Sequence, residues 1–259
     1  MMSSGHLKRW LIGSVVAAVA TWALMGSIRG LPKMFSGLPF AWDYLSKMWP
    51  PDFGVLPGLA APLAETLQSA ILGVSVAAAI SIPLSFLVAH NTTPGATVYT
   101  IGRGIINLCR GLPTLLWAIL FVSMVGLGPL AGVFAIICHC IGTFGKTFSE
   151  AIEATGPRVV NVLEAMRLDG AAEKEVILYG LLPEVAPLLA SYIIYYFEWA
   201  VRVGTILGLV GAGGIGLELT MAIRSFRRQE TSAIIIVILA LVTVIDQCSR
   251  HIRRGLLEI

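Results

Sequence analysis

Two opposite charges, Glu198 and Arg202, stand inside a long apolar run of the chain. Their four-residue spacing places both side chains on one face of a helix, where they can form an ion pair. Charges in a hydrocarbon environment are costly unless they are paired or hydrated, and they usually face the interior of a helix bundle. The pair is therefore either a neutralised structural element or part of an anion pathway that Arg202 lines while Glu198 holds its orientation.

Three further side chains in apolar runs could do acid–base or ligand chemistry, namely His139, Lys146 and Asp246. An intramembrane enzyme would need a second catalytic group beside His139 or Asp246, and none lies at a helical offset from either. His139 is either a hydrogen-bonded structural residue or a substrate ligand. Lys146 either reaches towards lipid headgroups or faces the substrate path. We therefore expect no catalytic residue.

The glycine-rich segment 211–216 resembles a phosphate-binding loop only superficially, because no Lys-Ser/Thr follows it and no strand precedes it. We expect its glycines to break a helix, to allow close packing against a second copy of the chain, and to expose backbone N–H groups to an anion. This outer mouth would be formed by Gly211, Gly213, Gly214 and Gly216. No metal site is expected, because Cys138-x-Cys140 lacks a second pair and no second His lies at ligand spacing.

The composition is that of an integral membrane protein. Mean hydropathy is +0.83, 56% of the residues are hydrophobic and only 13% are charged. The net charge of +3 is small and the basic residues are scattered, which excludes nucleic acid as the expected partner. Membrane lipid is the expected surroundings.

The apolar runs are continuous and not alternating, so the expected fold class is all-α with about six transmembrane helices. We place the spans at about Trp10–Ile28, Pro62–Ala89, Leu112–Val125, Leu130–Phe148, Glu184–Val210 and Ala233–Asp246.

The segments between the spans have separate expectations. Residues 29–61 contain Pro and Trp and suit an interfacial segment on the outer surface. Tyr99–Arg110 is expected to be a short amphipathic segment on the cytoplasmic side that leads into the third span. The third and fourth spans should pack as a tight hairpin through Gly132, Gly142 and Gly145. Basic residues favour the side that holds both termini, which is therefore expected to be the cytoplasm.

The polar connector Ser149–Pro183 is too charged to lie in a bilayer. Pro157 suits a first helical turn, and apolar residues then recur at helical spacing until Asp169-Gly170. A second short helix is expected over Ala171–Gly180, ending before Leu182-Pro183. A helix–turn–helix element of this kind can insert into a cleft on a soluble protein.

This connector resembles the EAA loop, the coupling helix of permease subunits in bacterial ABC importers. The resemblance is carried by Glu164-Ala165, Gly170 and Leu182-Pro183, with departures at Met166 and Gly180. Further stretches resemble phosphonate-importer permeases over most of the chain, from about Pro62 to Asp246. These stretches are Arg110–Pro113 with Trp117-Ala118, Val125–Gly132, His139–Lys146 and Val201–Gly216.

The resemblance implies a type I ABC importer permease fold in a bacterial cytoplasmic membrane. The partners implied are a second copy, two ABC ATPase subunits that hold ATP and Mg, and a periplasmic or lipoprotein substrate-binding protein. This chain would bind no cofactor and would not be an enzyme. Independently of the resemblance, the basic Lys8-Arg9 and the apolar run after it predict a signal-anchor helix, followed by the interfacial segment, in residues 1–61. Residues 62–259 would form the permease core, with its coupling element at about 156–183.

The site residues that follow fall into three groups. ATPase coupling is expected of Glu164, Ala165, Met166, Arg167, Asp169, Gly170 and Pro183. The translocation pathway is expected to include Arg202, Glu198, His139 and Lys146. We expect that Arg224, Arg227 and Arg228 are either solvated charges or contacts to acidic residues of the binding protein.

Other functions remain open at this point. Within importers, the substrate is phosphonate or alternatively phosphite, hypophosphite or another small oxyanion or solute. An intramembrane enzyme is a distant alternative, and a structural scaffold would tolerate substitutions in the connector.

Overall fold

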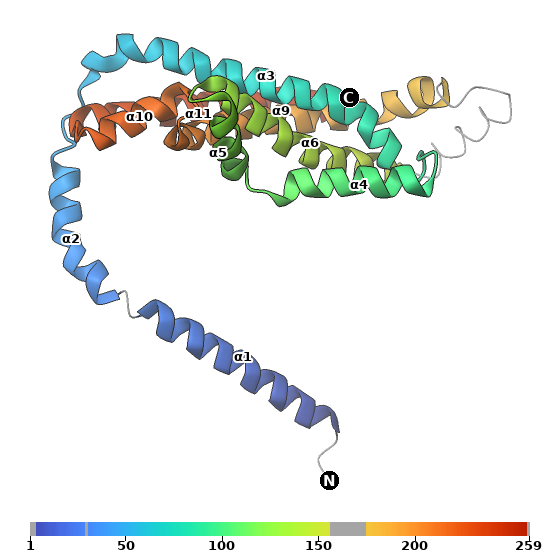
Figure 1. The fold of residues 1–259 in the computed structure, drawn as a ribbon, viewed down its shortest axis with the longest axis horizontal. Coiled ribbons are helices and arrows are strands. Elements are labelled where there is room, and N and C mark those ends of the chain that lie inside the picture. Colours follow the sequence, from blue (N-terminus) through green and yellow to red (C-terminus); the bar gives the residue numbers. More distant parts are fainter. Residues whose placement is uncertain (1–3, 29–30, 156–174, 258–259) are drawn as a thin grey trace. The chain divides into compact units, whose positions relative to one another are not determined.

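The computed structural model describes residues 4–28, 31–155 and 175–257, and the regular structure in these ranges is entirely helical (Figure 1). The all-α prediction is confirmed. The chain divides into two compact units, Met1–Pro50 and Pro51–Ile259.

The first unit consists of α1 (Ser4–Ile28) and α2 (Leu31–Ser46). Within α1 the apolar stretch is Gly13–Gly26, which is shorter than the roughly 20 residues of a full span. Phe40 and Trp42 of α2 are largely exposed. Exposed aromatic side chains on a helix suit the predicted interfacial segment, whose place at a membrane surface stays a prediction.

Four helices of the second unit are long and apolar enough to cross a membrane. They are α3 (Leu56–Val88), α6 (Pro129–Glu153), α9 (Leu182–Leu207) and α11 (Arg228–Leu257). All four begin before their expected first residues, and α6 and α11 also end later than expected. α3 begins six residues before Pro62 because Pro57 fits its first turn, and α11 continues through the basic end of the chain.

The expected third span, Leu112–Val125, does not cross by itself. It is α5 (Thr114–Val125), whose 12 residues extend about 18 Å. α5 follows α4 (Ala96–Gly111) at an angle of 90°, and only together are the two apolar and long enough to count as a span. Pro113 causes the bend, since it holds Leu112 in extended backbone and removes a hydrogen-bond donor.

Short helices complete the second unit. These are the 3₁₀ turns η1 (Phe53–Val55) and η3 (Gly208–Val210), the π-helix η2 (Val176–Leu181), and α10 (Gly214–Arg224). The expected break before Leu182-Pro183 is wrong. The π-helix runs directly into α9, and Pro183 lies in the first turn of α9, where its missing N–H costs nothing.

The centre of the second unit is the contact between α3 and α6. Small residues of α3, among them Ala70, Gly73 and Ala77, are buried there. A Cβ at Gly73 would lie 2.7 Å from Cγ2 of Ile136 on α6, so the two helices approach as closely as a glycine allows. Phe144 and Phe148 of α6 stack with ring centroids 4.9 Å apart.

The glycines of α6 contact other partners than predicted. A Cβ at Gly142 would lie 2.5 Å from the backbone nitrogen of Arg110, and a Cβ at Gly145 would lie 2.8 Å from Ile106, both on α4. Gly132 packs against Ala212 in the glycine-rich segment. The expected glycine-mediated hairpin of α5 and α6 is therefore wrong. α5 instead contacts α6 through aromatic rings, with the Phe121 and Phe134 centroids 5.3 Å apart.

The close approach of α6 and α4 gives a stability prediction. In Gly142→Ala the new methyl group meets backbone atoms of α4, which cannot rotate away, so we expect a loss of about 1–3 kcal/mol of unfolding free energy. Thermal unfolding of the purified protein in detergent measures this effect.

The matched control is Gly104→Ala. Gly104 lies in α4, the helix that Gly142 of α6 contacts, and no atom lies within 4 Å of the new Cβ. It should be neutral or stabilise by up to about 1 kcal/mol through helix propensity. A Gly142→Ala protein that unfolds at or above the wild-type temperature would contradict the packing described here.

Candidate functional site

The helix break predicted at the glycine-rich segment is present. α9 ends at Leu207, and the chain then turns through Gly211, Gly213 and Gly214, with φ angles of +87°, +76° and +69°, into α10. Residues with a Cβ rarely adopt these angles, so glycine is required here. Gly208 and Gly216 face each other at backbone contact distance, which folds α10 back against the end of α9.

Two side chains of α3 hold the start of α10. The backbone N–H of Gly214 donates to Oε2 of Glu65 at 2.9 Å, and the N–H of Ile215 donates to Oγ1 of Thr66 at 2.9 Å. We name these two bonds the α10 latch. A carboxylate at the positive end of a helix is also electrostatically favourable.

The latch bears on one part of the expectation for the glycine-rich segment, the exposure of backbone N–H groups to an anion; its place at the outer mouth and its packing against a second copy stay predictions. The N–H groups of Gly214 and Ile215 already have partners in this chain, so they are not available to an anion. The N–H of Gly211 donates to Gly208 and that of Ala212 to Leu207. The close contacts of these glycines are likewise with atoms of this chain, namely of Leu127, Pro129, Thr66 and Thr205.

Glu198 and Arg202 form the predicted ion pair, with Nη2 of Arg202 2.6 Å from Oε1 of Glu198. The Glu198 side chain is 7% exposed, whereas that of Arg202 is 53% exposed. A second arginine, Arg253 of α11, places its Nη2 3.7 Å from Oε2 of Glu198 and lies over the Tyr195 ring. One buried carboxylate thus holds two guanidinium groups.

Arg253 was missed because it lies seven residues beyond Asp246, where the last span was predicted to end. A usable signal exists: Asp246, Arg250 and Arg253 follow one another at spacings of four and three, which marks a continuing helix face. Asp246 and Arg250 do pair, at 2.8 Å.

The depth of the cluster follows from its neighbours. Gly204, two residues after Arg202, packs against Thr66, and Thr66 lies ten residues, about 15 Å, from the Leu56 end of α3. From Thr66 to the Val88 end of α3 is a further 22 residues, about 33 Å. Arg202 therefore presents its charge within the apolar length of the bundle and not at either end.

His139 and Lys146 do not join this cluster directly. The His139 ring stacks on Trp199, the neighbour of Glu198, with centroids 4.6 Å apart, and its Nδ1 is buried without a hydrogen-bond partner in the described part of the chain. Lys146 pairs with Glu150 of its own helix at 3.4 Å. The structure thus brings His139 close to the α9 charges and places Lys146 two turns further along α6.

The coupling residues Glu164, Ala165, Met166, Arg167, Asp169 and Gly170 lie outside the described residues. Pro183 is described, in the first turn of α9. Arg224 ends α10, and Arg228 begins α11. Between them, Arg227 pairs with Glu230 at 2.6 Å. Within the described ranges, no three His, Cys, Asp or Glu residues are grouped to hold a metal ion.

Comparison with known proteins agrees with this architecture. A chain in the inward-facing structure of the MetNI methionine ABC transporter superposes with a TM-score of 0.67 at 20% identity, covering 79% of this chain and 99% of that one. This likeness confirms the predicted type I ABC importer permease fold.

Two sequence relatives carry names that concern phosphorus compounds. The phosphite transport system permease protein PtxC of Stutzerimonas stutzeri is 39% identical over 239 residues, which cover 92% of this chain and 85% of PtxC. PhnE2 of Escherichia coli, described as a cryptic phosphonate transport system permease protein, is 45% identical over 122 residues, or 47% of this chain and 98% of PhnE2.

Residues 81–257 match the model of a single protein family, described as the binding-protein-dependent transport system inner membrane component. This match spans α6, the glycine-rich break and the charge cluster of α9 and α11. The chain belongs to this family of inner-membrane transport components.

Proposed function

We propose that this chain is the permease subunit of an ABC importer that takes up phosphonate across the bacterial cytoplasmic membrane. ATP hydrolysis occurs in partner ATPase subunits that hold ATP and Mg, and this chain carries no cofactor and catalyses no covalent step. Two copies form the pathway, both termini lie in the cytoplasm, and a binding protein delivers the substrate. The family match and the names of the relatives support this proposal.

The observation that carries the proposal is the half-exposed guanidinium of Arg202 within the apolar length of α9. A cation that faces lipid at this depth would be costly, so Arg202 faces water or a second copy of the chain. Glu198, buried beneath it, fixes its orientation, and Arg253 keeps the cluster positive overall. An arginine held in this way is suited to a phosphorus oxyanion, which it can bind through two parallel hydrogen bonds.

His139 supplies a second contact in this proposal. Its unpartnered Nδ1 lies beside Trp199, one residue from Glu198. Lys146 lies nearer the Glu153 end of α6 and would contribute positive potential where the substrate leaves the pathway. Arg224, Arg227 and Arg228 would contact acidic residues of the binding protein at the opposite end.

Coupling to ATP follows from the continuity of α9. We propose that Glu164, Ala165, Met166, Arg167, Asp169, Gly170 and Pro183 bind or position the ATPase. Pro183 lies in the same helix as Glu198 and Arg202, with Pro187 between them, so a displacement of the connector reaches the charge cluster through one continuous helix. Such a shift needs a connector that is held differently in the two states of the ATPase.

Phosphite is the second candidate substrate. The PtxC relative, named for phosphite, aligns with 92% of this chain, whereas the phosphonate relative PhnE2 aligns with 47%. Both substrates are small phosphorus oxyanions, and the same arginine chemistry binds either.

The first prediction concerns the partners. The chain, co-expressed with the ATPase and binding protein of its transport system, should co-purify with the ATPase. Hydrolysis should rise several-fold with binding protein loaded with phosphonate. Glu164→Lys should remove the ATPase, while Asp43→Lys, a charge reversal in the exposed pair of α2, should not. Stimulation by phosphite-loaded protein alone would select phosphite, and a purified chain that retains no ATPase would exclude the proposal.

The second prediction concerns Arg202. In Arg202→Ala we expect uptake of labelled phosphonate into cells to fall at least about tenfold. The reason is that the substrate loses its charged hydrogen bonds to the guanidinium, and truncating one partner of such a pair typically costs about 2 kcal/mol or more of binding free energy. Co-purification with the ATPase should be unchanged.

The matched control is Arg250→Ala. Arg250 is 54% exposed and pairs with an acid four residues earlier, as Arg202 does, but it lies outside the cluster at Glu198. Its uptake should stay close to wild type. Equal uptake by both variants would remove Arg202 from the pathway.

A further inference from the structure

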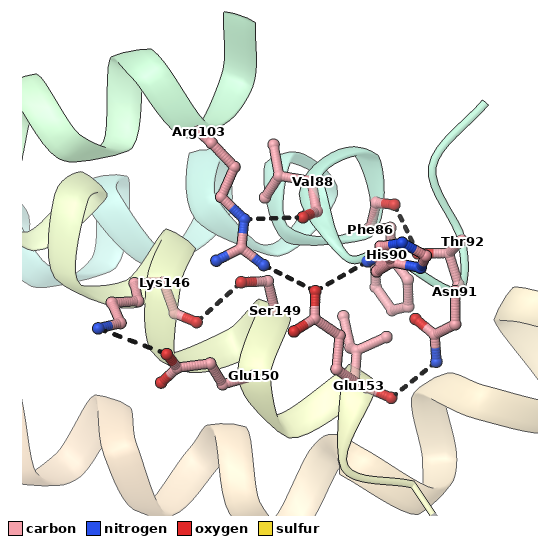
Figure 2. A network of polar contacts seen from close by, with 11 residues as sticks. Phe86, Val88, His90, Asn91, Thr92, Arg103, Lys146, Ser149, Glu150 and Glu153 are labelled. Carbon is pink, nitrogen blue, oxygen red and sulfur yellow. Dashed lines mark hydrogen bonds and ion pairs between the residues drawn. The ribbon is translucent and has the colours of Figure 1, made fainter. Parts of the chain in front are cut away.

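The ends of α3 and α6 meet the middle of α4 in a polar cluster that the functions above do not use (Figure 2). α3 ends at Val88, α6 ends at Glu153, and Arg103 of α4 lies between them. We name the contacts among Val88, His90, Arg103 and Glu153 the helix-end clamp.

Arg103 contacts both neighbouring helix ends at once. Its Nε donates to the carbonyl oxygen of Val88 at 3.1 Å, and its Nη2 donates to Oε1 of Glu153 at 2.7 Å. The backbone N–H of His90 donates to the same Glu153 oxygen at 2.8 Å. Beside the clamp, the Asn91 amide donates to the carbonyl oxygen of Ile152 at 3.0 Å. In Figure 2 the bonds from Arg103 and His90 meet at Glu153 at the end of α6, and the second Arg103 bond goes to Val88 at the end of α3.

The electrostatics explain why the clamp needs both charges. Glu153 is the last residue of α6, where the helix dipole disfavours a carboxylate. Arg103 and the His90 N–H offset this cost. The two side chains are only 23% and 30% exposed, so water screens the pair less than it screens a surface ion pair. The guanidinium carbon also lies 5.2 Å from the centre of the Tyr99 ring.

Close packing makes the clamp stiff. Val88 and Ile152 are fully buried, and Gly102 of α4 lies directly against the Val88 side chain, where no larger residue would fit without displacement. A force on the end of α6 is therefore passed to α3 and α4 through short, partly buried contacts.

The position of the clamp in the chain suggests what force it carries. Glu153 lies three residues before position 156, where the proposed coupling element begins. On its other side, α4 leads through the 90° bend into α5, and α3 carries the α10 latch at Glu65 and Thr66.

We propose that Arg103 and Glu153 are positioning residues that transmit displacement of the connector to α3 and α4, and through them to the pathway. This inference rests on the proposed function, in which the connector binds an ATPase. The pair contacts neither substrate nor ATP. Its loss would leave hydrolysis running while fewer substrate molecules cross the membrane per ATP.

A neighbouring ion pair provides the matched control. Glu150, one turn before Glu153 on α6, pairs with Lys146 of the same helix and therefore joins no two elements (Figure 2). Removing its charge changes the local electrostatics of α6 but not the link between helices. Glu150→Gln should keep the wild-type number of substrate molecules imported per ATP.

The experiment uses the whole complex, reconstituted in lipid vesicles with its ATPase and binding protein, and measures substrate imported and ATP hydrolysed in the same sample. In Arg103→Glu and in Glu153→Arg, the ratio of import to hydrolysis should fall roughly fivefold or more, a typical lower limit for coupling between sites. The exchange variant carrying both substitutions should recover much of the ratio, because it restores an attractive pair.

Milder variants keep the proposal testable if charge reversal prevents assembly. Arg103→Lys keeps the charge but replaces the two nitrogens that donate to Val88 and Glu153 with a single one, and Glu153→Gln keeps an acceptor without its charge. Both should assemble and show a reduced ratio. A wild-type ratio in these variants, or an equal loss in Glu150→Gln, would overturn the proposal. Failure of the proposed function is distinct, because wild-type complex would then show no hydrolysis stimulated by binding protein.

Discussion

The rest of this architecture depends on two hydrogen bonds that the first N–H groups of α10 donate to side chains of α3. A helix that breaks within a hydrocarbon layer leaves backbone donors without water, and each such donor must find a partner inside the protein. Glu65 and Thr66 provide those partners, so α9 can stop at Leu207 and the chain can fold back. Because α9 stops there, Arg202 lies near the end of a helix that is shorter than its neighbour α3.

Much of the fold follows from local features of the sequence. Continuous apolar runs predict the long helices, the glycine-rich segment predicts the break after α9, and the spacing of Glu198 and Arg202 predicts their pair. These features depend on neighbours within a few residues, where helical periodicity is decisive. The boundary at Pro113 was also predicted, between the segment Tyr99–Arg110 and a span from Leu112, but the sequence did not show that the second part is too short to cross alone.

The contacts that could not be predicted join residues far apart in the chain. Glu65 reaches residue 214, Arg103 reaches residue 153, and Arg253 reaches Glu198. Each charge is unremarkable in its own segment, and its partner is set by how the helices pack. The same holds for Gly142. Its spacing from Gly145 predicts a helix face of small residues, but it does not predict whether α4 or α5 packs on that face. Polar partners across helices are therefore where coordinates add most to the sequence.

The π-helix Val176–Leu181 has a consequence for evolution. A π-turn takes up one residue more than the α-helical turn it replaces, and it leaves the flanking helix in phase. One codon could therefore be lost from this segment while Glu198 and Arg202 kept the face they present. An alignment of homologous genes should tolerate a one-residue gap between positions 176 and 181, but none within α9. Residues 176–181 can therefore change in length by one residue during evolution, whereas the length of α9 is fixed by the face on which Glu198 and Arg202 must lie.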